Sequence, residues 1–272
     1  MKKLLLCLAL ALPVTAQASS TMDRIIKDGI IRCGYVTYEP GMHKDTATGQ
    51  LSGYDYDAMQ AVANRLDIKA TYPVETGWGT FTADLKSKKF DVLCGGSWVN
   101  PKIGKFVLFS RPVRFEPIYL VARADDKRFD KDLAAVNDEK IKLVGLDGDN
   151  PVFIAKTDFP KAKIVELPDM TDFSQTLVNV EAGKADVTIV DRYTFGTYND
   201  HNPGKLKIVQ PNHPIRIYPT SFAFLPEDYQ LRDAVNAALD ELILDGTISR
   251  LNKKYEKYPG VYLDAEVPVK KQ

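Results

Sequence analysis

Histidine and cysteine are scarce in this sequence, and their scarcity excludes most kinds of metal centre. The chain of 272 residues contains three histidines and three cysteines. His43, His201 and His213 are far apart and lie beside turn-forming residues, so we expect them in surface loops. The cysteines show no zinc-binding spacing. Residues 147–150 resemble the start of a calcium loop, but Pro151 stands where a further acidic ligand is needed. We therefore predict no metal site.

Catalytic and cofactor motifs are also missing. The sequence contains no GxGxxG fingerprint, no P-loop and no GxSxG nucleophile elbow. Basic and acidic residues balance at 36 each, so no electrostatic feature indicates nucleic acid as a partner. We therefore predict no catalytic residues, no cofactor and no nucleic-acid partner, and a protein that is not an enzyme.

Long apolar runs are absent after the first residues of the chain. A pair of lysines precedes a short apolar run over residues 4–12, and a small-x-small cleavage site ends at Ala18. This is the layout of a cleavable signal peptide, and the run is too short to span a bilayer. Cys7 lies inside the run without small residues before it, which argues against a lipoprotein anchor. We predict that residues 1–18 are a signal peptide and that the mature protein is soluble in the periplasm.

Strand-like and helix-like segments alternate along the rest of the chain. Short apolar runs predict strands, and apolar residues at helical spacing predict helices between them. The result is two successive βαβαβ units, an order that implies an α/β fold of parallel strands with right-handed crossovers. The first unit has predicted strands over 30–36, 70–74 and 90–94 and helices over 56–66 and 81–89. The second has strands over 143–146, 163–166 and 187–190, a helix from near Pro151 and a helix over 172–181.

A short sequence pattern recurs at equivalent places in the two units. Lys-Phe-Asp-Val at 89–92 and Lys-Ala-Asp-Val at 184–187 each lead from a helix into the third strand of a unit. The repetition indicates that the two units have the same local structure at this point.

Two extended stretches are predicted to carry the chain between the units. They cover residues 118–123 and 220–225, and the chain then ends in amphipathic helices. We therefore predict two lobes, the first formed by residues 19–114 together with 221–272 and the second by 115–220. Two connecting strands form a hinge, and ligands bind in a cleft at the ends of such sheets.

Five short motifs occur in order along the mature chain. They are Gly53-Tyr54-Asp55-Tyr56-Asp57, the segment 78–91 that begins with Trp78, Phe109-Ser110-Arg111-Pro112, the segment 181–186, and Asp245-Gly246-Thr247 with the helix after it. Together they resemble the extracellular solute-binding proteins of polar amino-acid ABC importers, family 3. The resemblance extends from about residue 23 to residue 258. It implies a two-lobed periplasmic-binding-protein-like fold of type II, with a mostly parallel sheet flanked by helices in each lobe. It also implies a monomer that binds a small-molecule solute and docks on the membrane permease of an ABC transporter.

The resemblance further implies which residues contact the ligand. Tyr38 and Trp78 match two aromatic residues that pack on either side of the ligand's side chain. Asp191 matches the acid that pairs with the ligand's α-ammonium group, where a charge-assisted hydrogen bond in a dry cleft is strong and selective. Gly96 lies in the segment after the third strand, which also contributes to the pocket.

Several positions depart from the family pattern. Trp98 stands where a hydroxyl is expected, and Ile103 stands where an arginine is expected to hold the ligand's carboxylate. In the second lobe, Asp149 and Asn150 replace small hydroxyl residues after Gly148. Loss of the arginine removes a bidentate carboxylate partner, and an added acid repels a carboxylate. The sequence therefore predicts an amine-bearing or cationic solute.

Alternatives remain for individual residues of this pocket. The rings of Tyr38, Trp78 and Trp98 can surround a cation, each worth roughly 0.5 to 2 kcal/mol. Alternatively, Trp98 packs in the core of the first lobe. Arg111 or Arg114, near the first connecting strand, can also replace the missing carboxylate clamp.

Cys33 and Cys94 remain after signal-peptide cleavage. The sheet order that the resemblance implies would place them on neighbouring strands, where they can form a disulfide in an oxidising compartment. Two separate buried thiols are the alternative.

Two other functions are compatible with the same fold. One is a sensing module without a transport role, and the other is an enzyme of the dehydratase type that resembles this family. The missing arginine argues against the enzyme, because such an enzyme also needs an anchor for a substrate carboxylate.

Overall fold

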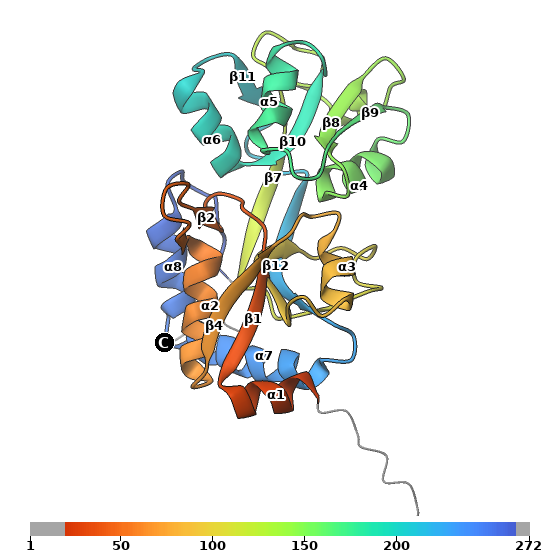
Figure 1. The fold of residues 1–272 in the computed structure, drawn as a ribbon. Coiled ribbons are helices and arrows are strands. Elements are labelled where there is room, and N and C mark those ends of the chain that lie inside the picture. Colours follow the sequence, from red (N-terminus) through yellow and green to blue (C-terminus); the bar gives the residue numbers. More distant parts are fainter. Residues whose placement is uncertain (1–19, 265–272) are drawn as a thin grey trace, which may run out of the picture.

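The structure, a computed structural model, describes residues 20–264 as two lobes connected by two long strands (Figure 1). The signal peptide predicted for residues 1–18 lies outside the described residues. The connecting strands are β7 (Arg114–Arg123) and β12 (Arg216–Phe224), and they pair with each other in antiparallel orientation. Each strand begins four residues before the stretch predicted for it, 118–123 or 220–225, and each extends into both lobes.

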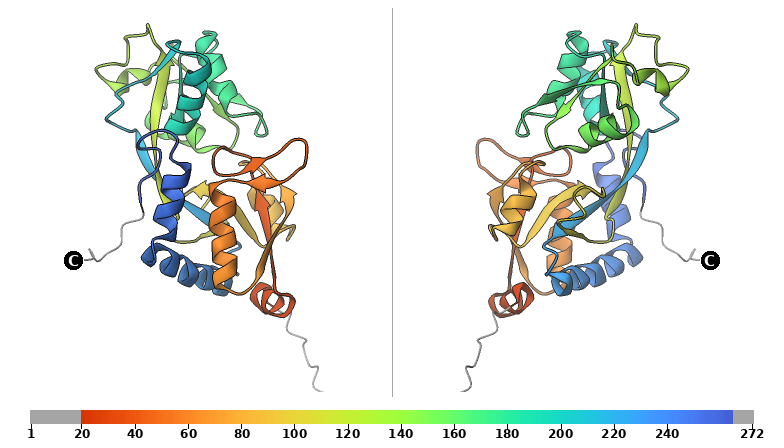
Figure 2. Two further views of the ribbon diagram at one scale, coloured as in Figure 1. Left: turned by 90° about the vertical axis from the view of Figure 1, so that its left-hand side faces the viewer. Right: turned by 90° about the vertical axis from the view of Figure 1, so that its right-hand side faces the viewer.

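The first lobe is a mostly parallel sheet with helices on both faces (Figure 2). Its elements are α1 (Thr21–Asp28), β1 (Ile30–Tyr35), β2 (His43–Lys44), β3 (Leu51–Ser52), α2 (Tyr54–Arg65), β4 (Lys69–Glu75), α3 (Phe81–Lys86), β5 (Val92–Trp98), β6 (Leu108–Phe109), α7 (Tyr229–Leu244) and α8 (Thr247–Tyr255). The strand order is β4-β1-β5-β12, in which β12 is antiparallel to β5. The helices α7 and α8 follow β12 and pack against α2, so the end of the described chain belongs to the first lobe.

The second lobe repeats the same design at the other end of the sheet. Its elements are η1 (Leu133–Val136), β8 (Lys142–Leu146), α4 (Asn150–Asp158), β9 (Lys163–Leu167), α5 (Ser174–Glu181), β10 (Val187–Asp191), α6 (Arg192–His201) and β11 (Leu206–Ile208). The order β7-β10-β8-β9 has β8 parallel to β9 and β10, while β7 is antiparallel to β10. One apolar core lies on each face of this sheet.

Burial explains why these segments form strands and helices. Every residue of β5 is buried, as expected for a central strand that is covered on both faces. In α7, by contrast, the buried residues recur at helical spacing and the charged residues face solvent; the buried ones are Leu231, Val235, Ala238, Leu239 and Leu242.

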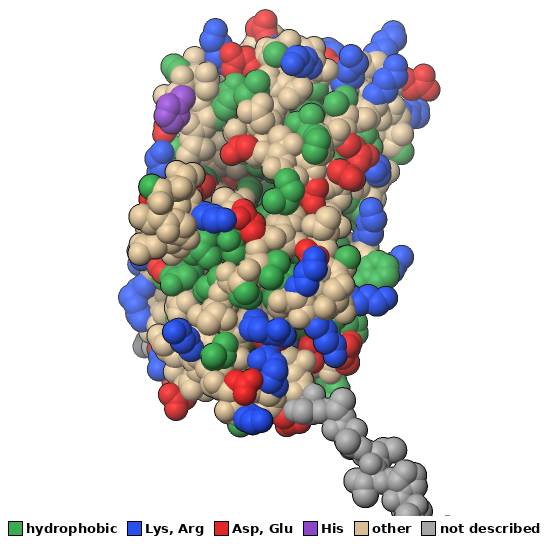
Figure 3. Space-filling view, in the orientation of Figure 1, with side chains coloured by type: hydrophobic (Ala, Val, Ile, Leu, Met, Phe, Trp, Pro, Cys, Tyr) green, Lys and Arg blue, Asp and Glu red, His purple; other side chains and the backbone are tan. Residues whose placement is uncertain are grey.

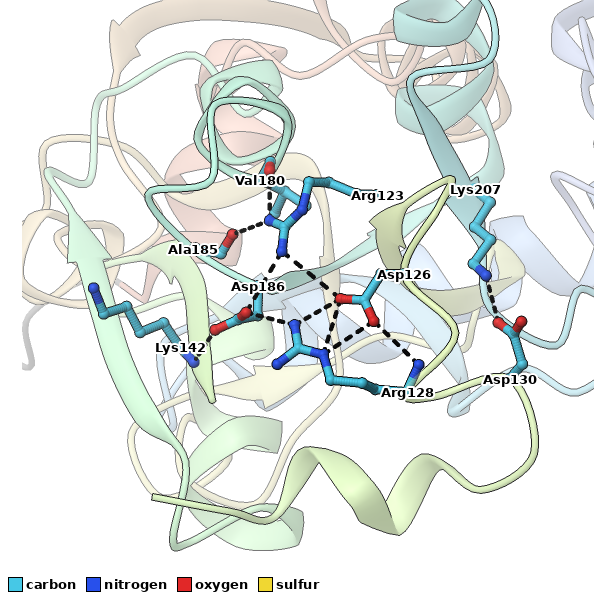
Figure 4. A network of polar contacts seen from close by, with 9 residues as sticks. All are labelled: Arg123, Asp126, Arg128, Asp130, Lys142, Val180, Ala185, Asp186 and Lys207. Atoms are coloured by element: carbon cyan, nitrogen blue, oxygen red, sulfur yellow. Dashed lines mark hydrogen bonds and ion pairs between the residues drawn. The ribbon is translucent and has the colours of Figure 1, made fainter. Parts of the chain in front are cut away.

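An aspartate before the third strand of each unit connects that strand to its neighbour. Asp91 accepts a hydrogen bond from the backbone N–H of Arg32 at 2.8 Å. Asp186 accepts one from the N–H of Lys142 at 2.9 Å, and two arginines pair with its carboxylate (Figure 4). The repeated sequence pattern therefore marks equivalent contacts in the two lobes.

Cys33 of β1 and Cys94 of β5 form a disulfide between neighbouring parallel strands. Their Cα atoms are 5.4 Å apart, and both residues are fully buried. The disulfide that the sequence suggested is therefore present, and the alternative of separate thiols is wrong.

The helix α6 was not predicted, although it borders the site. It begins directly after β10, and Asp191 is its N-cap. Its sequence is rich in aromatic and small polar residues, which have weak helix propensity. Gly196 in its middle lets the ring of Tyr258 approach closely, since a Cβ there would lie 2.6 Å from that ring. Capping and tertiary packing therefore form this helix, not apolar periodicity.

Candidate ligand-binding site

A cavity of about 20 Å³, here called the inner cavity, lies where the two lobes meet. Its walls come from both lobes. The lining residues are Tyr38, Trp78, Gly96, Ser97, Trp98 and Ile103 from the first lobe and Gly148, Asp149, Asn150 and Phe173 from the second. The structure thus brings together all the residues expected to bind ligand except Asp191.

A second and larger space, here called the outer cleft, opens beside the inner cavity with a volume of about 640 Å³. Figure 3 shows a recess on this face of the molecule. Tyr38, Trp78 and Phe173 line both spaces. The Tyr38 ring meets the other two edge-on, with centroid distances of 6.1 Å to Trp78 and 5.7 Å to Phe173. These three rings form the boundary between the inner cavity and the outer cleft.

Phe173 was not singled out in the sequence. It lies directly before α5, in a loop whose local pattern does not distinguish it from other apolar residues. Its role at the boundary depends on contact with Tyr38, which is 135 residues away in the sequence. No short-range pattern could have indicated that contact.

Asp191 does not line the inner cavity, and its carboxylate accepts hydrogen bonds from the chain itself. Its Oδ1 accepts hydrogen bonds from the backbone N–H groups of Tyr193 and Thr194 at 2.7 and 2.9 Å. Its Oδ2 accepts from the hydroxyls of Thr194, at 2.8 Å, and of Tyr38. Asp191 therefore caps α6 and links the second lobe to the first. Burial, together with this carboxylate and that of Glu116, raises the pKa of the Tyr38 hydroxyl well above its usual value.

Asp149 has a different environment, although it also caps a helix. Its Oδ1 accepts a hydrogen bond from the N–H of Asn150 at 2.6 Å at the start of α4. Within residues 20–264, no group donates a hydrogen bond to its Oδ2, which is buried. Burial raises the pKa of this carboxyl group to about 7, and the acids Asp169 and Asp191 act in the same direction. Asp149 is therefore a buried acid of the cavity lining, with one oxygen that accepts no hydrogen bond from the described residues.

Asn150 connects the lobes beside Asp149. Its Oδ1 accepts a hydrogen bond from Asn100 Nδ2 at 2.6 Å, and its own Nδ2 donates to the carbonyl oxygen of Trp98 at 3.2 Å. These contacts position the first turn of α4 against the segment that follows β5.

Trp98 lines the inner cavity and packs against the second lobe at the same time. Its indole stacks on Tyr218 of β12, with ring centroids 5.4 Å apart and an interplanar angle of 7°. Its indole N–H donates to the carboxylate of Glu116. Burial raises the pKa of Glu116. Trp98 is thus held rigidly, and the core it joins belongs to the second lobe, not to the first as the packing alternative proposed.

The two arginines suggested as carboxylate partners lie elsewhere. Arg111 is exposed and pairs with Asp240 of α7 at 2.8 Å, outside both the inner cavity and the outer cleft as described. Arg114 is 1% exposed and pairs with Asp55 and Glu116. This corrects the expectation that either arginine replaces the missing clamp, because neither guanidinium reaches a cavity wall.

Two kinds of feature are absent from the described part of the chain. In residues 20–264, no three His, Cys, Asp or Glu side chains are grouped closely enough to hold a metal ion. Over the same residues, no helix is long and apolar enough to cross a membrane.

The two lobes, the paired connecting strands and the cavity between the lobes define a periplasmic binding protein of type II, and solved structures support this class. The ancestral amino acid-binding protein AncCDT-1, described as a precursor of cyclohexadienyl dehydratase, superposes with a TM-score of 0.75 at 28% identity. The match covers 88% of this chain and all of that one. Residues 31–258 match the bacterial extracellular solute-binding proteins, family 3, and the chain belongs to that family.

Curated relatives include both binding proteins and an enzyme. The L-cystine-binding protein TcyA of Bacillus subtilis is 30% identical over 237 residues, which cover 85% of this chain and 82% of that protein. Cyclohexadienyl dehydratase of Pseudomonas aeruginosa is 27% identical over 227 residues, 82% of each chain. The family is thus mainly one of solute-binding proteins, with an enzyme among the relatives.

Proposed function

We propose that this protein is the periplasmic substrate-binding component of an ABC importer and binds a small amine-bearing or cationic solute between its lobes. The observation that supports the ligand class is the composition of the inner cavity wall. Aromatic rings and the carboxylate of Asp149 line it, and in the described chain no lysine or arginine does. Rings and a buried carboxylate attract a cation, whereas a ligand carboxylate would find no cationic partner there.

The remaining parts of the proposal concern how the molecule works. Residues 19–114 and 221–272 form the first lobe, residues 115–220 form the second, and residues 1–18 direct export to the periplasm. The paired strands β7 and β12 act as the hinge, and ligand stabilises the closed arrangement of the lobes. The closed monomer then docks on the membrane permease.

A thermal-shift panel followed by calorimetric titration tests the ligand class. The panel contains zwitterionic amino acids, diamines, quaternary amines and organic acids without an amine. We expect at least one amine-bearing compound to raise the melting temperature and to bind with a dissociation constant in the micromolar range or lower, about −8 kcal/mol. Stabilisation by organic acids alone would contradict the proposal.

Transport and enzymatic activity are distinguished by the fate of the bound compound. The dehydratase relative raises the possibility of turnover on this scaffold. We propose binding without chemistry, because the cavity wall of the described chain holds no cationic anchor for a substrate carboxylate. NMR of the compound after prolonged incubation with the protein should show it unchanged, and conversion to a new product would identify an enzyme instead. A sensing role would require a membrane receptor as partner. Copurification of the protein with a permease from membranes would argue against that role.

A further inference from the structure

Asp149 lines the inner cavity, whereas Asp191 does not, and the two buried aspartates also differ in how many hydrogen bonds they accept from the protein. Both oxygens of Asp191 accept hydrogen bonds from groups of the protein. Asp149 has a single partner on Oδ1, and within the described residues its Oδ2 has none. A buried carboxylate oxygen without a donor costs free energy unless a ligand supplies one. The unsatisfied oxygen therefore indicates where a donor from the ligand is expected.

The surroundings of Asp149 favour a positively charged donor. The ring of Trp98 and the boundary rings of Tyr38, Trp78 and Phe173 line the same cavity, and the faces of aromatic rings attract an organic cation in a dry site. The residue is 9% exposed, so its charge is poorly screened by water. An ammonium group there would supply both a hydrogen bond and the opposite charge.

The size of the inner cavity limits what can enter it. A volume of about 20 Å³ accommodates a group of about the size of one water molecule. An ammonium head fits this volume. The outer cleft, which shares the rings of Tyr38, Trp78 and Phe173 with the inner cavity, provides space for the rest of a larger ligand.

The outer cleft is also unsuited to a carboxylate. Among the described residues, its lining includes four acids and one basic side chain, His201. Two of the acids have ion-pair partners, Glu75 with Lys44 and Glu39 with His43, and the other two are Asp169 and Asp172. A second ammonium or another donor group of the ligand would be favoured here, whereas a carboxylate would be repelled.

We propose that Asp149, rather than Asp191, is the anchor for the ligand's ammonium group, and that the protein selects organic amines without a carboxylate over the corresponding amino acids. This inference rests on the proposed function and specifies its ligand class. Asp191 then acts as a positioning residue that caps α6 and holds Tyr38.

Matched ligand pairs test the selectivity. Lysine and cadaverine differ by the carboxylate alone, and so do arginine and agmatine. Calorimetric titration of the full mature protein at pH 8 should show cadaverine or agmatine binding at least about tenfold more tightly than its amino-acid counterpart, because a buried unpaired charge is costly. Equal or tighter binding of the amino acid would overturn the inference and leave the proposed function standing. No binding of any amine in either pair or in the wider panel would overturn both.

Asp149→Asn tests the anchor. Asparagine keeps the shape of the side chain and the N-cap hydrogen bond but removes the charge. We expect amine affinity to fall roughly 10- to 100-fold, as for loss of a charged hydrogen bond. The control Asp132→Asn alters another helix-capping acid that is exposed and distant from the cavity, and it should leave affinity unchanged. Unchanged amine affinity in Asp149→Asn, with a large loss in Asp191→Asn, would assign the anchor to Asp191 and overturn the inference.

The pH dependence of amine binding provides a further measurement. Three titratable groups interact electrostatically with Asp149. They are Asp169, in the loop after β9, Asp191 of β10, and the hydroxyl of Tyr218. Because an ionised Asp149 binds the ammonium, affinity for the amine should fall about tenfold for each pH unit below about 7. Asp149→Asn should abolish this dependence while its melting temperature shows that it is folded. The same pH dependence in the variant would assign it to Asp169 or Asp191 and contradict the inference.

Discussion

At the scale of single residues, the candidate site depends on which polar atoms the chain satisfies. Asp149 and Asp191 are both buried helix caps, but Tyr38 and Thr194 complete the partners of Asp191 alone. Arg114 is likewise fully engaged by Asp55 and Glu116 beneath the cavity. Asp191 and Arg114 therefore support the structure, whereas Asp149 combines an unsatisfied oxygen with a place in the cavity lining.

The free energy of unfolding of the ligand-free protein should fall as pH rises from about 4 to about 7. Asp149 in the unfolded chain loses its proton near the ordinary aspartate pKa of 3.8, whereas the folded protein retains the proton up to about 7. The unfolded state therefore binds fewer protons over this interval, and the difference amounts to on the order of 4 kcal/mol at pH 8. Urea denaturation should show Asp149→Asn close to wild type near pH 4 and more stable at pH 8. A constant difference between the two proteins across this range would contradict the assignment.

At the scale of elements, equivalent contacts in the two lobes connect neighbouring strands. Asp91 links β5 to β1, and Asp186 links β10 to β8, each through a backbone N–H. In Figure 4, Arg123 of β7 also donates to the carbonyl oxygens of Val180 and Ala185 near the end of α5. The carbonyl of Val180 is in the last turn of α5, where carbonyl groups lack helical partners, and that of Ala185 is in the turn that leads into β10. Such contacts keep β5 and β8 in place, and the end of β5 and the residues after β8 line the inner cavity.

The disulfide stabilises one of these strand pairs. It connects β1 to β5 across a sequence separation of 61 residues, and closing such a loop reduces the entropy of the unfolded chain by an amount worth about 4 kcal/mol. We expect the double variant Cys33→Ala/Cys94→Ala to lose roughly 2 to 5 kcal/mol in urea denaturation without loss of the fold. Wild-type protein denatured and refolded in reductant should show a similar loss. If the double variant and the reduced wild-type protein are both as stable as the oxidised wild type, the disulfide contributes nothing to the free energy of unfolding.

At the scale of the whole molecule, contacts between the lobes set the balance between open and closed arrangements. The hydrogen bond from Tyr38 to Asp191 and the pair formed by Asn100 and Asn150 both join the first lobe to the second. Asp169 and Asp200 of the second lobe also accept hydrogen bonds from the first lobe, and β7 and β12 provide the covalent connection within the described chain. A few polar contacts can therefore control closure, because the hinge itself is only two strands wide.

Tyr38→Phe should shift the ligand-free protein toward the open arrangement. The substitution removes a hydrogen bond worth about 1 kcal/mol, which is roughly a fivefold change in the ratio of open to closed molecules. Small-angle X-ray scattering should show a larger radius of gyration. Tyr255→Phe, which removes a hydroxyl bonded to Asp57 within the first lobe, is the matched control and should leave the radius unchanged. Identical scattering from both variants would show that this contact does not control closure.

The sequence by itself determined the order of the strands and helices in the two βαβαβ units, and the family. Periodic apolar residues and the five motifs are local features, so they located the strands of both units and the segments that line the cavity. The tertiary structure alone decided which side chains remain free, because their partners are distant in the sequence. The contacts of Tyr38 with Asp191 and of Trp98 with Tyr218 each join residues more than a hundred positions apart. Such contacts engage Asp191 and hold Trp98, while one oxygen of Asp149, a residue of the cavity lining, accepts no hydrogen bond from the described residues.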